Sequence, residues 1–168
     1  GQFKANTFNH EGFSALYLAL REPAPEVADL LIEDPRTELN LENAWGENAL
    51  MMAALRGLLP QAIRMMELGA HVNKKGWAPL HYAASSVSEH AQAMVHLLLE
   101  HSAYIDAGSP NGSTPLMMAA EFGQIDVARL LLQEGADPTI KNQQGRTALD
   151  FARRAERDGL AADIVRAM

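Results

Sequence analysis

The histidines are the residues of this chain whose types and spacing most readily suggest chemistry. Of the six histidines, His90, His96 and His101 lie close to Glu89 and Glu100. Imidazole and carboxylate groups bind divalent metals, but ligands on one helix need a spacing of three or four residues to point the same way. Only His96 and Glu100 have it. A surface or packing role is therefore favoured, and a small-ligand or metal-binding array that uses the His90/His96/His101 region is the alternative function.

Pairs of methionines are a second group with metal-binding chemistry. Met51–Met52, Met65–Met66 and Met117–Met118 recur at helical spacings, where methionine mostly fills irregular gaps in a core. Core packing is the favoured interpretation. A copper site or an adaptable peptide-binding surface at Met52 and Met118 is the alternative.

The sequence contains no arrangement typical of a catalytic centre. It has no cysteine, which excludes disulfides, thiol catalysis and thiolate zinc sites. No glycine-rich phosphate loop follows a strand, and no serine–histidine–aspartate set has supporting context. Thr147 and Asp150 have the spacing of a helix capping box. We therefore expect no enzyme, no resident metal and no cofactor.

The charge balance and the distribution of apolar residues argue against a nucleic-acid partner and a membrane span. The net charge is −7, whereas a surface that binds nucleic-acid phosphates needs an excess of basic residues. No apolar run approaches the roughly 18 residues that indicate a membrane-spanning helix. We expect neither a nucleic-acid partner nor a membrane span.

Five similar segments would position all of these side chains. Thr114 is a good N-cap, Pro115 suits the first helical position, and Gly123 and Gly135 would end two short helices in the most regular segment. Such helices are too short to be stable alone, so the segments must stack. Glycines at 12, 46, 76, 112 and 145 are spaced by 34, 30, 36 and 33 residues. They precede the motifs Ser14-Ala15-Leu16, Asn48-Ala49-Leu50, Ala78-Pro79-Leu80, Thr114-Pro115-Leu116 and Thr147-Ala148-Leu149.

A period near 33 with a Thr-Pro-Leu-His-type start resembles the ankyrin repeat. The resemblance implies an all-α solenoid of about five helix–turn–helix repeats with short β-hairpin fingers. It covers residues 1–168 as a single domain, in which the polar fifth repeat resembles a capping repeat. Residues 1–11 begin without methionine and occupy the place of a loop that closes a preceding repeat, so we expect further sequence upstream. The repeats are expected at about 9–42, 43–72, 73–108, 109–141 and 142–168.

The uneven glycine spacing predicts two local departures. The 30-residue spacing before Gly76 predicts a curtailed finger at 71–76, whereas the fingers at 103–112 and 136–145 should be regular. The 36-residue spacing that follows predicts a longer turn at 85–90. Helices are expected near 14–21, 25–34, 48–56, 60–68, 79–87, 90–101, 114–122, 125–134, 147–156 and 160–167.

The resemblance also implies structural roles for individual residues. The family uses the histidine at the position of His81 to hydrogen-bond the neighbouring loop, although Ala78 replaces its usual threonine partner here. Leu116, Leu130 and Leu131 occupy inter-helix positions of the most regular repeat and are expected to be buried.

Function follows from the resemblance more than from any single motif. Ankyrin arrays bind other proteins through a concave face made of finger tips and first helices, so we expect a monomer that binds another protein. The uneven repeats are similar to those of bacterial stand-alone ankyrin proteins, some of which are exported. A narrower expectation is therefore an exported bacterial adaptor, stress or toxin-neutralising protein. The absent cysteine also favours a periplasmic or secreted location, with the cytoplasm as the alternative.

The contact positions of the family flank the finger glycine and close the first helix of each repeat. Both tryptophans fall at these positions, and Trp and Arg are common interface hot spots; packing of Trp45 and Trp77 on the adjacent finger is the alternative. Lys74, Lys75 and Arg56 favour a partner that carries acidic or aromatic groups. The expected partner-binding residues are Phe13, Trp45, Glu47, Arg56, Lys74, Lys75, Trp77, Glu121, Phe122, Arg146 and Arg153.

Overall fold

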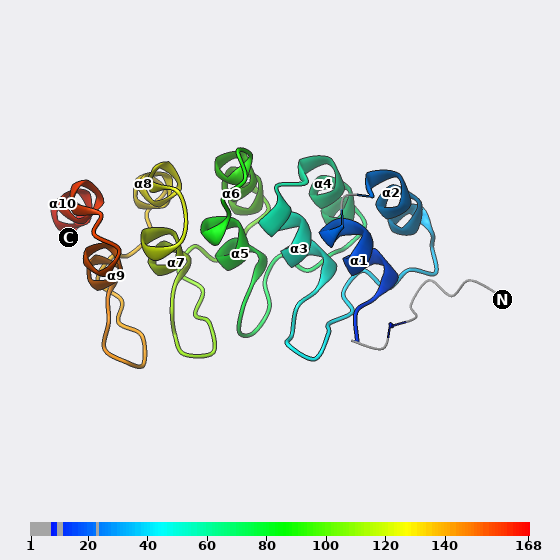
Figure 1. The fold of residues 1–168 in the computed structure, drawn as a ribbon, viewed down its shortest axis with the longest axis horizontal. Coiled ribbons are helices and arrows are strands. Elements are labelled where there is room, and N and C mark those ends of the chain that lie inside the picture. The colour runs from blue at the N-terminus through cyan, green and yellow to red at the C-terminus, as the bar shows by residue number, and fades with distance from the viewer. Residues whose placement is uncertain (1–7, 10–11, 23) are drawn as a thin grey trace.

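Ten helices in five consecutive pairs build the part of the chain that the computed structural model describes, which is residues 8–9, 12–22 and 24–168. Figure 1 shows the odd-numbered helices in one layer and the even-numbered helices in a second. The loops before the odd-numbered helices, here called fingers, project from the odd-numbered layer. The expected all-α solenoid is confirmed. The helices are α1 (Ala15–Arg21), α2 (Pro25–Glu33), α3 (Ala49–Arg56), α4 (Leu59–Glu67), α5 (Pro79–Ser85), α6 (Ala91–Glu100), α7 (Pro115–Glu121), α8 (Ile125–Gln133), α9 (Ala148–Arg154) and α10 (Asp158–Ala167).

Polar residues fix where the odd-numbered helices begin. Ser14, Asn48 and Thr114 each accept a side-chain hydrogen bond from the backbone N–H three residues further on, which satisfies a donor that the helix leaves unpaired. In the last repeat the N–H of Thr147 donates to Oδ2 of Asp150 at 2.8 Å, one half of a capping box. These four helices therefore begin at an equivalent point of their repeats, whereas α5 begins after Ala78 without a side-chain cap.

The core lies between the two layers and between successive repeats. Leu50, Leu80 and Leu116 follow the helix start by the same interval in three repeats, and all three are almost completely buried. The expected burial of Leu116, Leu130 and Leu131 is confirmed. In such an array each repeat packs mainly on its neighbours, so stability is shared along the stack.

Side chains at the base of the fingers join successive repeats at a regular interval. Oδ1 of Asn40, Asn73 and Asp106 accepts a backbone N–H that lies 31 residues further on, at 2.7, 2.8 and 3.0 Å respectively. The three acceptors are 33 residues apart. The repeats are therefore evenly spaced at this point, although the spacing of the finger glycines varies.

The fingers are tight turns. In the second finger the N–H of Asn43 donates to the carbonyl of Glu47 at 2.9 Å, and its Oδ1 accepts the N–H groups of Trp45 and Glu47. Among the described residues the only β pairing is an isolated bridge between Phe8 and Ser14, so the expected β-hairpin character is not confirmed. The asparagine side chain accepts the N–H groups that strand pairing would otherwise use.

The third finger is curtailed and is closed in a different way. Asn73 serves the inter-repeat register described above, so no asparagine remains to close this turn. Nζ of Lys74 donates instead to the carbonyls of Lys75 and Trp77, both at 3.0 Å. This finger is therefore closed by an ammonium group that donates to carbonyls, whereas the second finger is closed by an amide oxygen of Asn43 that accepts N–H groups.

The connector between α5 and α6 is lengthened and shortens the preceding helix. Oγ of Ser86 donates to the carbonyl of Leu55 at 2.7 Å and accepts the N–H of Ser88 at 3.1 Å. These bonds hold the chain extended directly after Ser85, so α5 ends there and not near residue 87.

The last helix pair also differs from expectation. α9 ends at Arg154 and α10 already begins at Asp158, because Glu156 adopts a left-handed conformation with φ of 57° between them. No helix in the described part of the chain combines the length and the apolar character needed to cross a lipid bilayer.

His81 is fully buried and joins the third repeat to the fourth. Its Nδ1 accepts the N–H of Ala78 at 3.1 Å, and its Nε2 lies 2.9 Å from the carbonyl of Ser113. Because a carbonyl only accepts, Nε2 carries the proton. Burial lowers the pKa of His81, so the imidazole stays neutral. The expected bond to the neighbouring loop is present, and the backbone of Ala78 replaces the missing threonine.

Candidate protein-binding surface

The fingers and the odd-numbered helices form one continuous face, which we call the finger face (Figure 1). All the expected partner-binding residues lie in the fingers, in the odd-numbered helices or at the ends of those helices. They do not form one cluster. The structure brings some together around a hollow, and others take part in internal contacts.

A hollow of about 320 Å³ crosses α3, α5 and α7 on the finger face. Three of the expected residues, Glu47, Trp77 and Phe122, line it. Most of its lining is apolar, which is typical of a surface that another molecule covers. The complete lining is Glu47, Leu55, Trp77, Tyr82, Ser85, Met118 and Phe122.

Glu47 is held by side chains from three repeats. Its Oε1 accepts hydrogen bonds from the hydroxyl of Tyr17 at 3.1 Å and from Nδ2 of Asn43 at 3.0 Å. Its Oε2 accepts the hydroxyl of Tyr82 at 2.6 Å. Burial, together with the adjacent carboxylate, raises the pKa of both tyrosines. The carboxylate is thus fixed at one end of the hollow and the tyrosines stay protonated.

An aromatic stack lies beside this carboxylate. The ring of Phe13 stacks on Tyr17, with centroids 5.0 Å apart, and on Trp45 at 5.6 Å. The guanidinium of Arg21 lies 5.0 Å from the centre of the Phe13 ring. Trp45 nevertheless remains 64% exposed, so its indole packs on the first finger and still presents most of its surface to solvent.

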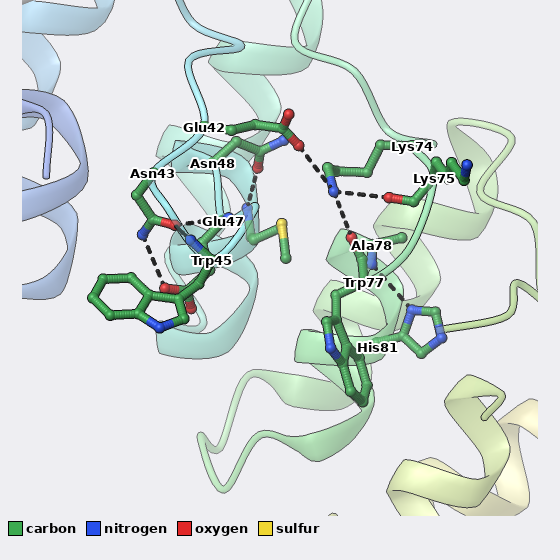
Figure 2. A network of polar contacts seen from close by, with 11 residues as sticks. Glu42, Asn43, Trp45, Glu47, Asn48, Lys74, Lys75, Trp77, Ala78 and His81 are labelled. Carbon is green, nitrogen blue, oxygen red and sulfur yellow. Dashed lines mark hydrogen bonds and ion pairs between the residues drawn. The ribbon is translucent and has the colours of Figure 1, made fainter. Parts of the chain in front are cut away.

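Trp77 lies on the third finger and is half-buried. Its ring meets His81 edge-on, with centroids 5.3 Å apart, and Figure 2 shows it beside that imidazole and separate from Trp45. The contact to His81 fixes the ring, and the rest of the indole lines the hollow.

The expected cationic group around Lys74 is divided by the structure. Nζ of Lys74 forms an ion pair of 2.9 Å with Glu42 and also binds two finger carbonyls (Figure 2). Its charge is therefore compensated within the chain. Lys75 and Arg56 are exposed, and neither lines the hollow.

The remaining expected residues lie toward the C-terminal end. Phe122 directly follows α7 as its C-cap, lines the hollow and is 56% exposed. Glu121 forms an ion pair of 3.4 Å with Arg154. Arg146 and Arg153 are exposed in the last repeat and do not reach the hollow.

The histidine region has a different geometry from a metal site. Nε2 of His90 lies 3.5 Å from Glu89, and Nδ1 of His101 lies 2.9 Å from the carbonyl of Leu97. Within the described residues no group of three or more histidine, cysteine or acidic side chains is placed to hold a metal ion. The structure therefore lends no support to the metal-binding alternative.

Sequence reasoning missed several residues of this surface. Tyr17 and Tyr82 bind Glu47 across 30 and 35 residues of sequence, a distance at which no local pattern operates. A partly buried tyrosine on an odd-numbered helix needs a hydrogen-bond partner for its hydroxyl. That requirement is the signal from which the two tyrosines could have been predicted. Met118, which was considered as a peptide surface, does line the hollow with Leu55.

The comparisons with known proteins agree with this architecture. The family model for ankyrin repeats (3 copies) matches residues 16–109 and residues 89–167. The chain is 32% identical over 137 residues to the nuclear factor NF-kappa-B p105 subunit of Mus musculus, which covers 78% of this chain and 14% of that protein. It is 30% identical over 152 residues to the B-cell lymphoma 3 protein homolog of Mus musculus, and this match covers 86% of this chain and 33% of that protein.

A more distant match is the human transient receptor potential cation channel subfamily A member 1, which is 27% identical over 158 residues and covers 88% of this chain and 14% of that protein. The chain thus spans about a third or less of the length of these relatives. All three are animal proteins, so a bacterial origin stays an expectation. The repeated motif, the stacked helix pairs and the matching family model together establish that the chain belongs to the ankyrin-repeat family.

Proposed function

We propose that this chain binds another protein through its finger face, as a monomer, with the hollow across α3, α5 and α7 at the centre of the contact. Ankyrin repeats generally serve as protein-interaction modules, and solenoid arrays bind partners through extended surfaces. The observation that carries the proposal is the hollow, which apolar and aromatic side chains from three repeats line together with one fixed carboxylate.

The exposure of large apolar side chains supports the same conclusion. Phe122 lines the hollow and Trp45 lies on the second finger, and both leave most of their surface uncovered. Isolated exposed apolar residues are common, but aromatic groups beside an apolar hollow are typical of interaction sites. Trp is also among the residues that most often dominate binding energy.

A pair of matched double variants tests the proposal. A crosslinking pull-down from the native organism identifies the partner, and its affinity is then measured for Trp77→Ala/Phe122→Ala. The control is Leu30→Ala/Val165→Ala, which removes exposed side chains from α2 and α10. We expect the first variant to bind at least about tenfold more weakly and the control to bind like the parent.

The opposite pattern, in which only the variant on the even-numbered helices loses binding, would place the contact on the other face and overturn the proposal. Circular dichroism of each variant checks that the helices remain. The narrower role of an exported bacterial adaptor, stress or toxin-neutralising protein rests on the resemblance alone, and the identity of the captured partner tests it.

A further inference from the structure

The hollow on the finger face has one charged residue in its lining. Of the seven residues that form it, Glu47 is the one that carries a charge at neutral pH. Its three hydrogen-bond donors, Tyr17, Asn43 and Tyr82, are all neutral. The hydrogen bonds therefore orient the carboxylate without neutralising it, and the negative charge remains at the edge of an apolar hollow.

Building on the proposed function, we propose that the hollow receives an arginine side chain of the partner protein, flanked in the partner by apolar residues. A carboxylate can accept about four hydrogen bonds. Oε1 of Glu47 already accepts two, whereas Oε2 accepts one, from Tyr82. Oε2 thus retains an acceptor position for one charge-assisted hydrogen bond from an incoming cation.

The walls of the hollow suit a guanidinium better than an ammonium. Trp77 and Phe122 supply aromatic surface, and Leu55 and Met118 supply aliphatic surface. A guanidinium stacks on aromatic rings and is more weakly hydrated than the ammonium of lysine. The methylene groups of an arginine would pack on the aliphatic surface while the head group reaches Glu47.

Charge complementarity points the same way at longer range. The chain has a net charge of −7, which favours the approach of a basic segment. An acidic side chain in the hollow would face the charge of Glu47 and is disfavoured. The ammonium of Lys74 is already paired with Glu42, so it offers little attraction to an acidic partner at this point.

Peptide selection tests the inference without a known partner. Random dodecapeptides displayed on phage are selected on the full chain and depleted on Trp77→Ala/Phe122→Ala, which retains peptides that depend on the hollow. We expect these peptides to share an arginine next to apolar residues. Replacement of that arginine by citrulline, which keeps the shape and removes the charge, should weaken binding about tenfold. Replacement by lysine should also weaken it.

Two further measurements identify Glu47 as the acceptor. In Glu47→Gln the arginine and citrulline peptides should bind equally, whereas Glu134→Gln, which changes the same charge at the exposed end of α8, should preserve the difference. On the unmodified chain, affinity for the arginine peptide should fall as salt concentration rises, and affinity for the citrulline peptide should change less. This second readout does not depend on the folding of any variant.

The outcomes separate this inference from the proposed function. Peptides that depend on the hollow but lack arginine, or that bind equally with citrulline or lysine, would overturn the arginine inference and leave the proposed function standing. Peptides that bind equally to the parent and to Trp77→Ala/Phe122→Ala in every selection would count against both.

Discussion

The hydroxyl of Tyr82 donates a hydrogen bond of 2.6 Å to Oε2 of Glu47, and so joins helix α5 to the finger of the preceding repeat. Tyr17 binds the other carboxylate oxygen from the first repeat. One side chain thus connects three repeats at the edge of the hollow. The carboxylate is positioned before any partner arrives, which reduces the ordering that binding must impose.

This arrangement predicts how the tyrosines titrate. Burial and the adjacent carboxylate raise the pKa of Tyr17 and Tyr82 above the ordinary value of about 10. Glu47→Gln should lower the pKa of both, though not fully, because burial remains. The ultraviolet absorbance of tyrosinate measures this in an alkaline titration, with Glu134→Gln as the charge-matched control. Identical titration curves for the parent and Glu47→Gln would show that the carboxylate has no influence.

The raised pKa of these two tyrosines also predicts how the free energy of unfolding changes at alkaline pH. Because the folded pKa of these tyrosines lies above the unfolded value, their contribution to the free energy of unfolding is complete below about pH 10 and is lost as pH rises through the folded values. Urea unfolding of the parent between neutral pH and pH values above 10 should show this loss. Glu47→Gln should lose less stability over that range.

The lowered pKa of His81 predicts that the free energy of unfolding also decreases at acid pH. Burial lowers its folded pKa below the unfolded value of about 6.5, so its contribution is complete above that pH and is lost as pH falls below it. His81→Gln should cost about 1–3 kcal/mol at neutral pH, because the buried partners Ala78 N–H and Ser113 C=O lose their bonds. It should also lose less stability than the parent between pH 7 and pH 5.

Urea unfolding at the two pH values measures both effects of His81→Gln, and the exposed His96→Gln is the matched control. Equal losses of stability on acidification in the parent and in His81→Gln would contradict the assignment of a buried neutral imidazole.

Leu130 tests the stacked core. Leu130→Ala should lower the free energy of unfolding by about 2–5 kcal/mol, since this side chain is buried in α8. Because repeats contact mainly their neighbours, hydrogen exchange should rise first in the C-terminal half. Leu30→Ala, at a position that is 75% exposed, should change stability by less than about 0.5 kcal/mol. Uniform loss of protection across all repeats would argue against the quasi-linear picture.

Gly123 occupies the turn between α7 and α8, where the chain passes very close to its neighbour. A Cβ atom at this position would collide with the backbone carbonyl of Ala84, so Gly123→Ala should cost about 1–3 kcal/mol. At Gly159 a Cβ meets nothing within 4 Å, and Gly159→Ala in α10 should be neutral or stabilising by up to about 1 kcal/mol. Thermal unfolding compares the stabilities of the two variants. Equal stabilities would show that the turn at Gly123 rearranges to accept a Cβ atom at little cost.

Much of the fold could be predicted because its signals are local and periodic. The cap at Thr114, the proline after it and the glycine spacing located the repeats, and the short spacing before Gly76 located the curtailed finger. The β-hairpin character of the fingers is not confirmed, because a turn closed by an asparagine side chain such as Asn43 leaves little backbone for strand pairing.

The candidate site was harder to predict because its parts are far apart in sequence. Trp77 and Phe122 were expected from the family pattern, but the hollow also depends on Leu55 of α3 and Met118 of α7, which are 63 residues apart in the sequence. Lys74 was expected to face a partner, and only the geometry reveals that its ammonium closes its own finger. A lysine that closes its own turn with its ammonium group leaves no recognisable pattern in the sequence.

Alanine substitutions at Trp45 and Arg56 give a further prediction for binding. Both side chains are exposed on the finger face, so Trp45→Ala and Arg56→Ala should each weaken partner binding by more than about 1 kcal/mol and leave the fold intact. Isothermal titration calorimetry with the captured partner measures this. Parent-like affinity in both variants, combined with loss of binding on substitution of the even-numbered helices, would show that the finger face is not the contact.

Fluorine NMR of the tryptophans tests the central claim most directly. The chain has two tryptophans, Trp45 and Trp77, and both lie on the finger face. Incorporation of fluorotryptophan into this chain alone gives one resonance for each, which Trp45→Phe assigns. We predict that saturation with the partner shifts both resonances and abolishes the solvent isotope effect at Trp45. Two resonances that stay unchanged at saturation would contradict binding through the finger face.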